Sequence, residues 1–457
     1  MQGVTVNSAS RPRSPLTVAQ EDVLSRQSAA LPRTNNSLRA RIQRATMTAR
    51  LQLQDRIFHW LGAGIIAAAA IQLSTAATGV ITSRVLQPAG KGALTAVLLW
   101  PSVIAFLATI GLGDAIAYYT ARRQMVLASG MWLAAALSAV AVPIGYFALP
   151  LVLTQLSTQE ISAARLYLTY IPLNLITLCL TSGLAGSLNI CEYHIARASV
   201  HIATLVATIV LIAAFGGSVY VCVMGSLVGN VIVLAIAAVY SFNRDLLRGG
   251  PDPYMMHGLA SFGLRSHMGS LAGMFNLRLD QMLMSLWLPP TALGLYAAAV
   301  TVSSCGTVLT STVAQSVLAH VASTPAEGDR YELVKRYLRL TLWGALVGCV
   351  TVWFLAPVLV SVFFGPTFMP AVWPARILAI ASVPLGANVV LGSSLKALGR
   401  PIAASRGEGF GLLITGVALV VLLPSAGPIG AAAASLAAYA AVCCYLAWQL
   451  THSRSPL

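Results

Sequence analysis

The apolar residues of this chain gather into blocks of about 20, the length of helix that spans a hydrocarbon layer of roughly 30 Å. Blocks of this length without strict two-residue alternation are typical of membrane helices and not of barrel strands. The blocks cover residues 60–82, 95–119, 125–149, 166–188, 198–215, 219–242, 267–288, 292–321, 338–364, 372–395, 409–423 and 427–450. The sequence therefore predicts an all-α membrane protein with about twelve transmembrane helices.

The shortage of charge supports this prediction. Only 9% of the residues are charged and 57% are hydrophobic, whereas a soluble domain carries about 25% charged residues. The formal net charge is +15, which on a soluble domain would suggest a nucleic-acid partner. Because the basic residues alternate between loops and form no single patch, we expect no nucleic acid to bind.

The basic residues mark one side of the predicted bundle. Nine arginines precede residue 60. The even-numbered loops hold Arg122, Arg123, Arg197, Arg244, Arg248, Arg330, Lys335, Arg336, Arg339, Lys396 and Arg400. The odd-numbered loops hold only Arg84, Lys91 and Arg165. Since basic loops stay in the cytoplasm, both termini are predicted to be cytoplasmic.

A polar break at residues 243–258 divides the predicted helices into two groups of about six. We expect a basic, disordered cytoplasmic tail at 1–59, an N-terminal six-helix lobe at 60–245, and a C-terminal six-helix lobe with a short cytoplasmic tail at 246–457. An alternative for part of the tail is a basic helix over 37–56 that lies on anionic lipid headgroups.

A short motif occurs once in each half. Residues 86–96 and 288–298 both read L-x-P-x-x-x-G-x-x-x-A. Each copy lies between the first and second predicted helices of its half. Since both precede a helix that runs from outside to inside, the pattern indicates a parallel duplication of a six-helix unit.

Sequence motifs of catalysis are absent. The chain has no GxxxxGK[ST], HExxH or GxSxG motif, and its loops are too short for a soluble catalytic domain. The histidines and cysteines show no metal-ligand spacing. We therefore predict a protein that is not an enzyme, with no catalytic residues, no metal and no cofactor.

Ionisable residues inside the predicted helices are the candidates for function. Asp114 lies in the second helix, and Arg278 and Asp280 lie near the middle of the seventh. A charge at mid-bilayer costs about 2.5–3.5 kcal/mol on insertion scales and usually faces a protein interior or a wet cavity. We predict that Arg278 binds an anionic group and that Asp114 or Asp280 contributes to ion coupling or gating. The alternative is a structural salt bridge between the second and seventh helices.

Several motifs follow one another in a characteristic order. They are 83–94 (SRVLQPAGKGAL), 110–115 (IGLGDA), 276–281 (NLRLDQ), 288–296 (LPPTALGLY), 363–371 (FFGPTFMPA), 396–401 (KALGRP) and 428–432 (PIGAA). In this order the chain resembles the bacterial polysaccharide biosynthesis transporters of the multidrug/oligosaccharidyl-lipid/polysaccharide exporter superfamily. The resemblance covers about residues 60–450.

The resemblance implies two six-helix lobes in a V around a central cationic cavity. It implies a flippase that moves polyprenyl-pyrophosphate-linked oligosaccharides across the bacterial cytoplasmic membrane by ATP-independent alternating access. A buried Arg suits a pyrophosphate. Arg84 and Asn276 lie within the matching motifs and join the binding or coupling candidates, although a helix–helix hydrogen bond is the alternative for Asn276. The implied partners are the lipid-linked oligosaccharide, the bilayer, and polysaccharide polymerase or export proteins.

Three other functions remain as alternatives. A multidrug/cation antiporter of the same superfamily would have a carboxylate-rich cavity poor in arginine, and Arg278 argues against it. A membrane enzyme of polysaccharide assembly would need a large outer loop. A lipid II flippase would often have helices beyond twelve.

Overall fold

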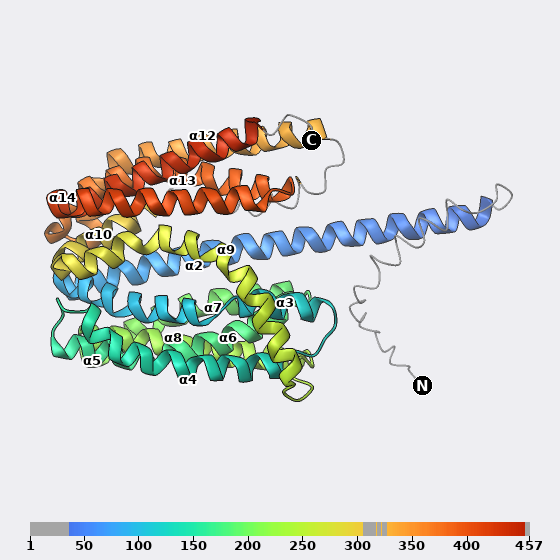
Figure 1. Cartoon of the computed structure of the whole chain (residues 1–457), viewed down its shortest axis with the longest axis horizontal. Coiled ribbons are helices and arrows are strands. Elements are labelled where there is room, and N and C mark those ends of the chain that lie inside the picture. Colours follow the sequence, from blue (N-terminus) through green and yellow to red (C-terminus); the bar gives the residue numbers. More distant parts are fainter. Residues whose placement is uncertain (1–35, 305–316, 318–320, 322–326, 453–457) are drawn as a thin grey trace, which may run out of the picture. The chain divides into compact units, whose positions relative to one another are not determined.

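A computed structural model describes residues 36–304, 317, 321 and 327–452 of the 457-residue chain. Every regular element in this part of the chain is a helix (Figure 1), which confirms the all-α prediction. The elements are α2 (Asn36–Ala108), α3 (Leu112–Ala121), α4 (Leu127–Val152), α5 (Thr158–Tyr167), α6 (Tyr170–Gly186), α7 (Ile190–Phe215), α8 (Val219–Asn243), α9 (Pro253–Trp287), α10 (Pro290–Ser304), α12 (Glu327–Leu359), the π-helix η2 (Val360–Phe364), the 3₁₀-helix η3 (Pro366–Ala371), α13 (Val372–Ala397) and α14 (Pro401–His452).

Within the described residues, eight helical stretches are long and apolar enough to cross a membrane, by length and composition. They are Gly62–Ala108, Leu127–Val152, Thr158–Gly186, Ile190–Phe215, Val219–Asn243, Arg330–Phe364, Pro366–Ala397 and Pro401–His452. The first and last contain a non-helical residue, Gln87 and Gly427 respectively, so each joins two helices at a kink. The chain is thus a multi-pass membrane protein. The arrangement of twelve helices in two six-helix lobes, with both termini in the cytoplasm, remains a prediction.

The kink at Gln87 corrects one prediction from the sequence. Arg84 and Lys91 were expected on an aqueous loop, but both lie inside α2. Pro88 disfavours helical geometry at the residue before it, and Gln87 adopts φ 57° and ψ 176°. The chain therefore turns at a single residue. Lys91 is held inside the protein, where its Nζ donates to Thr82 Oγ1 at 2.9 Å.

The chain divides into two units, Met1–Ile65 and Ile66–Leu457. Of the first unit, the structure describes residues 36–65, which are helical, so the basic helix considered for 37–56 falls within α2. Residues 1–35, the rest of the basic tail, lie outside the described residues.

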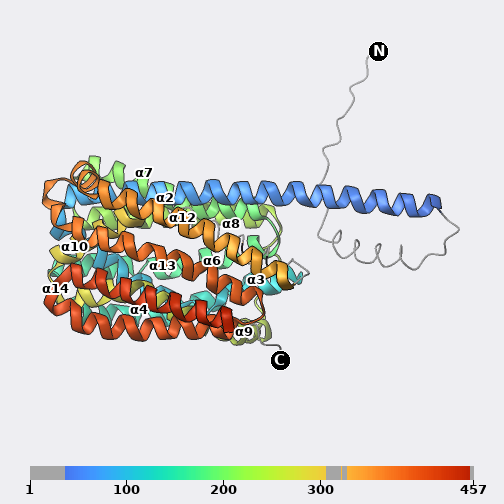
Figure 2. The ribbon, with the colours of Figure 1, turned by 90° about the horizontal axis from the view of Figure 1, so that it is seen from above.

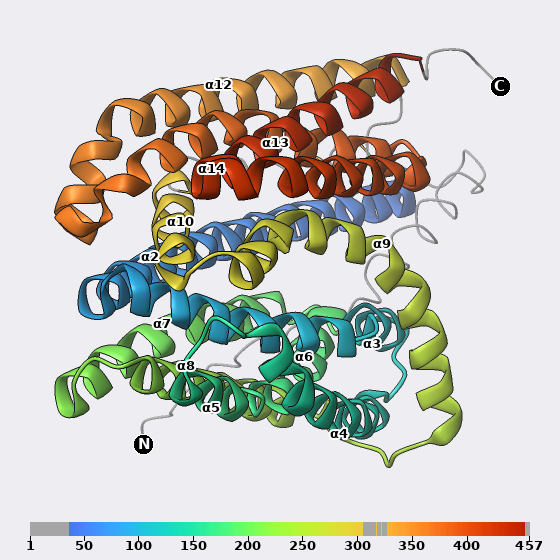
Figure 3. The same cartoon turned by 60° about the vertical axis from the view of Figure 1, so that its left-hand side comes forward.

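Helix contacts in the second unit fall into two sets. Helices α3, α4, α6, α7 and α8 pack among themselves, and α10, α12, α13 and α14 pack among themselves. Figure 2 shows α13 alongside α14, and Figure 3 shows α12 beside them. Helix α9 contacts members of both sets, namely α3 and α4 in the first and α10 and α14 in the second. Large apolar side chains face outward, including Phe147 (73% exposed) and Phe215 (75% exposed), as expected for a surface covered by lipid.

The two copies of the repeated motif pack directly against each other. A Cβ atom on Gly92 would lie 1.6 Å from the carbonyl oxygen of Pro290, and a Cβ atom on Gly294 would lie 1.9 Å from the carbonyl oxygen of Pro88. The contact is therefore reciprocal, and only glycine permits it. We call these four residues the Gly92 junction. The reciprocity supports the duplication inferred from the sequence.

A second close contact lies at the break between α2 and α3. Gly111 has φ 71°, and a Cβ atom on it would lie 2.1 Å from the carbonyl oxygen of Gly263 in α9. A Cβ atom on Gly263 would lie 2.6 Å from the carbonyl oxygen of Ile110. We call Ile110, Gly111 and Gly263 the Gly111 junction. Between the two junctions, Trp100 of α2 donates its indole N–H to Ser285 of α9 at 3.0 Å.

We predict that Gly294→Ala lowers the stability of the folded protein by about 1–3 kcal/mol, because a methyl group at this position must push two backbones apart. The matched control is Gly392→Ala in α13, where an added Cβ would have no atom within 4 Å. Thermal unfolding of the purified protein in detergent, followed by tryptophan fluorescence, measures both. Equal melting temperatures for the two variants would contradict the packing of the Gly92 junction.

Candidate functional site

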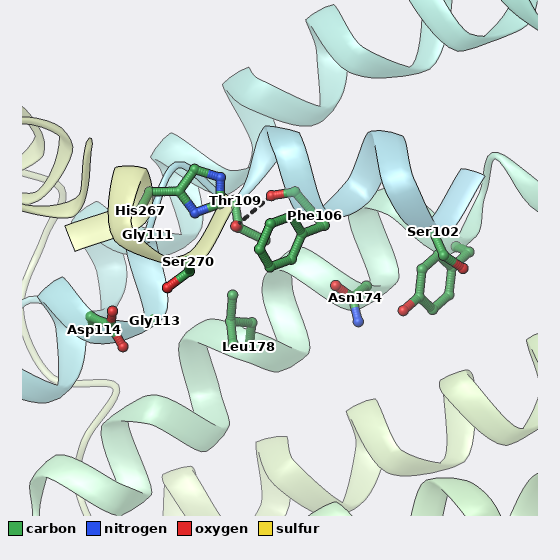
Figure 4. A pocket seen from close by; sticks show the side chains of 11 residues that line it. Ser102, Phe106, Thr109, Gly111, Gly113, Asp114, Asn174, Leu178, His267 and Ser270 are labelled. Atoms are coloured by element: carbon green, nitrogen blue, oxygen red, sulfur yellow. Dashed lines mark hydrogen bonds between the residues drawn. The ribbon is translucent and has the colours of Figure 1, made fainter. Parts of the chain in front are cut away.

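A cavity of about 400 Å³ opens where α2, α3, α6 and α9 meet. Its lining is Ser102, Phe106 and Thr109 from α2, Gly111 from the α2–α3 break, Gly113 and Asp114 from α3, Tyr170, Asn174 and Leu178 from α6, and His267 and Ser270 from α9. Figure 4 shows the ring of Phe106 between His267 and Asn174. The cavity thus brings side chains from three helices of the first half together with α9, the first helix of the second half.

His267 is, with Thr109, one of the two buried polar side chains of this lining. It is 5% exposed, and its ring centroid lies 4.9 Å from that of Phe106. Its Nε2 atom is fully buried and has no hydrogen-bond partner among the described residues. A buried polar atom without a partner costs about 1–3 kcal/mol, so this nitrogen is available to a ligand.

Asp114 lies close to His267 but is held by a different residue. Its Oδ2 atom accepts a short hydrogen bond from the hydroxyl of Ser266 in α9. The sequence predicted one helix over 95–119, but α2 ends at Ala108 and Asp114 lies in the first turn of α3, where it is exposed. The chain breaks there because Gly111 adopts a left-handed conformation.

Arg278 lies on α9 and does not line the cavity. Its Nη1 atom donates to Gln281 Oε1 at 3.4 Å, and its charge acts on the hydroxyl group of Tyr170, a residue of the cavity wall. In the part of the chain that the structure describes, no carboxylate forms an ion pair with Arg278. Arg278 is exposed, unlike the buried arginine expected from the sequence, and its guanidinium has no ion-pair partner among the described residues.

Asp280 faces away from Arg278, as their spacing requires. It is 6% exposed and accepts a short hydrogen bond from the hydroxyl of Tyr296 in α10. The backbone N–H of Gln281 donates to its other oxygen at 2.7 Å. Among the described residues, neither Asp114 nor Asp280 forms the salt bridge that was considered between the second and seventh helices.

Asn276 joins α9 to α14. Its side-chain oxygen accepts from Thr415 Oγ1 at 2.6 Å, and its Nδ2 donates to Glu408 Oε2 at 3.4 Å. This is the helix–helix hydrogen bonding that was the alternative reading for this residue. Asn276 does not line the cavity.

Arg84 does not line the cavity and contacts the other half of the chain. Its Nε donates to the carbonyl oxygen of Phe363 at 2.8 Å, and its Nη2 donates to that of Val362. One turn along α2, Gln87 accepts a hydrogen bond from Thr367 Oγ1 at 2.9 Å. Arg84 therefore satisfies the last carbonyls of η2, next to the Gly92 junction.

The sequence did not single out the residues that line the cavity beside Asp114. The histidines show no metal-ligand spacing, so the sequence does not distinguish His267, and it gives no signal for Asn174. One signal was present: His267 and Arg278 are 11 residues apart on one helix, which is close to three full turns of 3.6 residues. Nothing in the sequence placed Tyr170 and Asn174 opposite this helix face.

The cavity presents an imidazole, an amide, a carboxylate and hydroxyl groups beside two aromatic rings. Such a lining suits a polar organic ligand with some apolar surface. Within the described residues, no group of three or more His, Cys, Asp or Glu side chains could hold a metal ion.

The comparisons with known proteins agree with this architecture. A family model described as polysaccharide biosynthesis protein matches residues 60–323, more than half of the chain. No curated protein matches the chain.

Solved structures share its fold at low identity. An inward-facing MATE family multidrug transporter of the MOP superfamily has a TM-score of 0.71 at 14% identity, covering 86% of this chain and 100% of its own. The lipid II flippase MurJ, in an inward closed conformation, has a TM-score of 0.69 at 14% identity, with coverages of 85% and 87%. A MOP superfamily transporter from Pyrococcus furiosus has a TM-score of 0.60 at 16% identity, with coverages of 88% and 96%.

We predict that Tyr296→Phe destabilises the protein by about 1–3 kcal/mol, because it leaves the buried Asp280 carboxylate without its hydroxyl donor. Tyr220→Phe, at a tyrosine that is 51% exposed, is the control and is expected to be neutral. Thermal unfolding in detergent compares the two. If Tyr296→Phe melts at the temperature of Tyr220→Phe, the hydrogen bond to Asp280 does not stabilise this helix pair.

Proposed function

We propose, from the premise that this chain belongs to the polysaccharide biosynthesis protein family, that it is a flippase for polyprenyl-pyrophosphate-linked oligosaccharides. It moves them from the cytoplasmic to the outer leaflet of a bacterial cytoplasmic membrane, where polymerase and export proteins use them. The fold shared with MOP superfamily transporters supports a transporter and not an enzyme.

Arg278 is the observation that carries this proposal. Its guanidinium has no ionic partner in the described part of the chain and acts on Tyr170 in the cavity wall. Arg278 is exposed on α9, the helix that contacts both sets of helices, and a cation at a functional place in a membrane protein can be neutralised by a ligand anion. A pyrophosphate offers several oxygens to the planar guanidinium and forms charge-assisted hydrogen bonds with it.

The two glycine junctions support alternating access. Gly92 and Gly111 are separated by 19 residues of the chain, about 28 Å at 1.5 Å per residue, which is close to the thickness of a hydrocarbon core. Each junction closes the two halves against each other at one end of this stretch. We propose that the junctions separate in turn, and that the Gly92 junction is the outer one, given the predicted cytoplasmic position of both termini.

A multidrug/cation antiporter is the second candidate. The exposed carboxylate of Asp114 in the cavity lining favours it, because a cationic drug needs an anionic partner. The cation at Arg278 would repel such a substrate, and for this reason we prefer the flippase.

We predict that Arg278→Ala, expressed in a deletion strain, restores less than about a tenth of the wild-type surface polysaccharide, because a charged hydrogen bond is worth about 1.5–3 kcal/mol. Arg278→Lys keeps the charge but not the fork of donors, and is expected to be intermediate. Lipid-linked repeat units should accumulate on the cytoplasmic face. Polymer yield and membrane levels of each variant are measured together.

Arg248→Ala is the matched control, since it removes a cation whose ion-pair partner, Asp245, is exposed. It should restore polymer fully. Unchanged polymer in the deletion strain, together with raised sensitivity to cationic drugs, would replace the flippase with the antiporter.

We also predict that cross-linking Gln87→Cys to Thr367→Cys with a short bifunctional thiol reagent stops polymer export. The two native side chains are in hydrogen-bond contact at 2.9 Å beside the Gly92 junction, so the link holds that end closed. Each single-cysteine variant treated with the reagent is the control and should retain export. Normal export by fully cross-linked protein would show that this end does not open during transport.

A further inference from the structure

The cavity holds polar groups that the protein itself leaves without partners. Nε2 of His267 is buried and unpaired. Among the described residues, the amide of Asn174 and the hydroxyl of Ser270 also form no hydrogen bond. By contrast, the hydroxyls of Thr109 and Ser102 are occupied by backbone carbonyls of their own helix, at 2.7 and 2.6 Å. The free groups thus belong to facing helices, α9 and α6.

The apolar part of the lining is aromatic. Phe106 packs against the imidazole of His267, and Tyr170 and Leu178 continue the wall on α6. A ligand that uses both parts must have hydroxyl or amide groups around its edge and C–H groups on its face. A pyranose ring has this chemistry, and a cavity of about 400 Å³ is large enough to hold one.

The position of the cavity relative to Arg278 suits a ligand that carries both a sugar and a pyrophosphate. His267 and Arg278 lie near the same face of α9, because 11 residues are close to three turns. Their separation along a regular helix is about 16 Å. Tyr170 connects the two places, since it lines the cavity and interacts with the charge of Arg278.

We propose that this cavity is the site that recognises the sugar of the lipid-linked substrate, with His267 and Asn174 as the residues that hydrogen-bond its hydroxyl or acetamido groups. Asp114, held by Ser266 at the edge of the same cavity, is a further acceptor for a sugar hydroxyl. The inference rests on the proposed function. It divides recognition into a sugar site at His267 and Asn174 and a pyrophosphate site at Arg278.

The test compares two lipids on the purified full-length protein by native mass spectrometry. One is undecaprenyl pyrophosphate without sugar, and the other is the undecaprenyl-linked oligosaccharide fraction extracted from the deletion strain. We expect the wild type to bind the sugar-bearing lipid about tenfold more tightly than the bare lipid. His267→Phe and Asn174→Leu should lose that advantage and bind the bare lipid normally, whereas Arg278→Ala should lose affinity for both lipids.

His257→Phe is the control, since His257 lies on α9 and is exposed outside the cavity. Because His267 is buried, His267→Gln is measured as well and should keep part of the sugar advantage. If His267→Phe, His267→Gln and Asn174→Leu all bind both lipids as the wild type does, the sugar site is refuted while the flippase stands. The same refutation follows if these variants change only the pH dependence of transport. If the wild type binds neither lipid, the proposed function itself fails.

Discussion

Backbone contact between glycines is the constraint on which the rest of this structure depends. At the Gly92 junction each glycine lies against a proline carbonyl of the other half, and at the Gly111 junction the α2–α3 break lies against α9. No side chain separates the halves at these two places. The spacing of α2, α9 and α10 is therefore set by main-chain geometry, and the cavity occupies the space that remains beside the Gly111 junction.

The second constraint is that polar groups need hydrogen-bond or ionic partners, because the interior of a membrane has a low dielectric constant. Two buried polar side chains of α9 have such partners. Asp280 accepts a hydrogen bond from the hydroxyl of Tyr296, and Asn276 accepts one from the hydroxyl of Thr415. Arg278 and His267 differ, since one is a cation without an ionic partner and the other has a buried nitrogen without a donor or acceptor. Arg278 and His267 both lie on α9, the helix that contacts both sets of helices. This is where a transporter that moves its halves apart would hold a substrate.

The sequence predicted the helical class and the multi-pass membrane character, because both depend on local patterns of apolar residues, whereas the count of twelve helices and the duplication remain predictions. The reciprocal packing of residues 86–96 against 288–298 explains why the repeated glycine and proline occur at the same spacing. The sequence could not reveal that the chain turns at Gln87 by a kink and not by a loop, since the position of Arg84 depends on packing against η2. It also placed Asp114 within one continuous helix, because a helix pattern does not show where the left-handed Gly111 interrupts the chain. The cavity residues Tyr170 and Asn174 come from α6, about 100 residues before Arg278, and such pairings depend on tertiary structure.

The most direct measurement of the central claim is transport by the purified protein in liposomes that carry the lipid-linked oligosaccharide in their membrane. A membrane-impermeant glycosidase added outside cleaves only the sugars in the outer leaflet. The account predicts that wild-type protein makes nearly all of the substrate cleavable, while Arg278→Ala leaves about the half that already faces outward, as in protein-free liposomes. Equal cleavage in liposomes with wild-type protein and without protein would contradict the claim that this chain moves lipid-linked sugars across a bilayer.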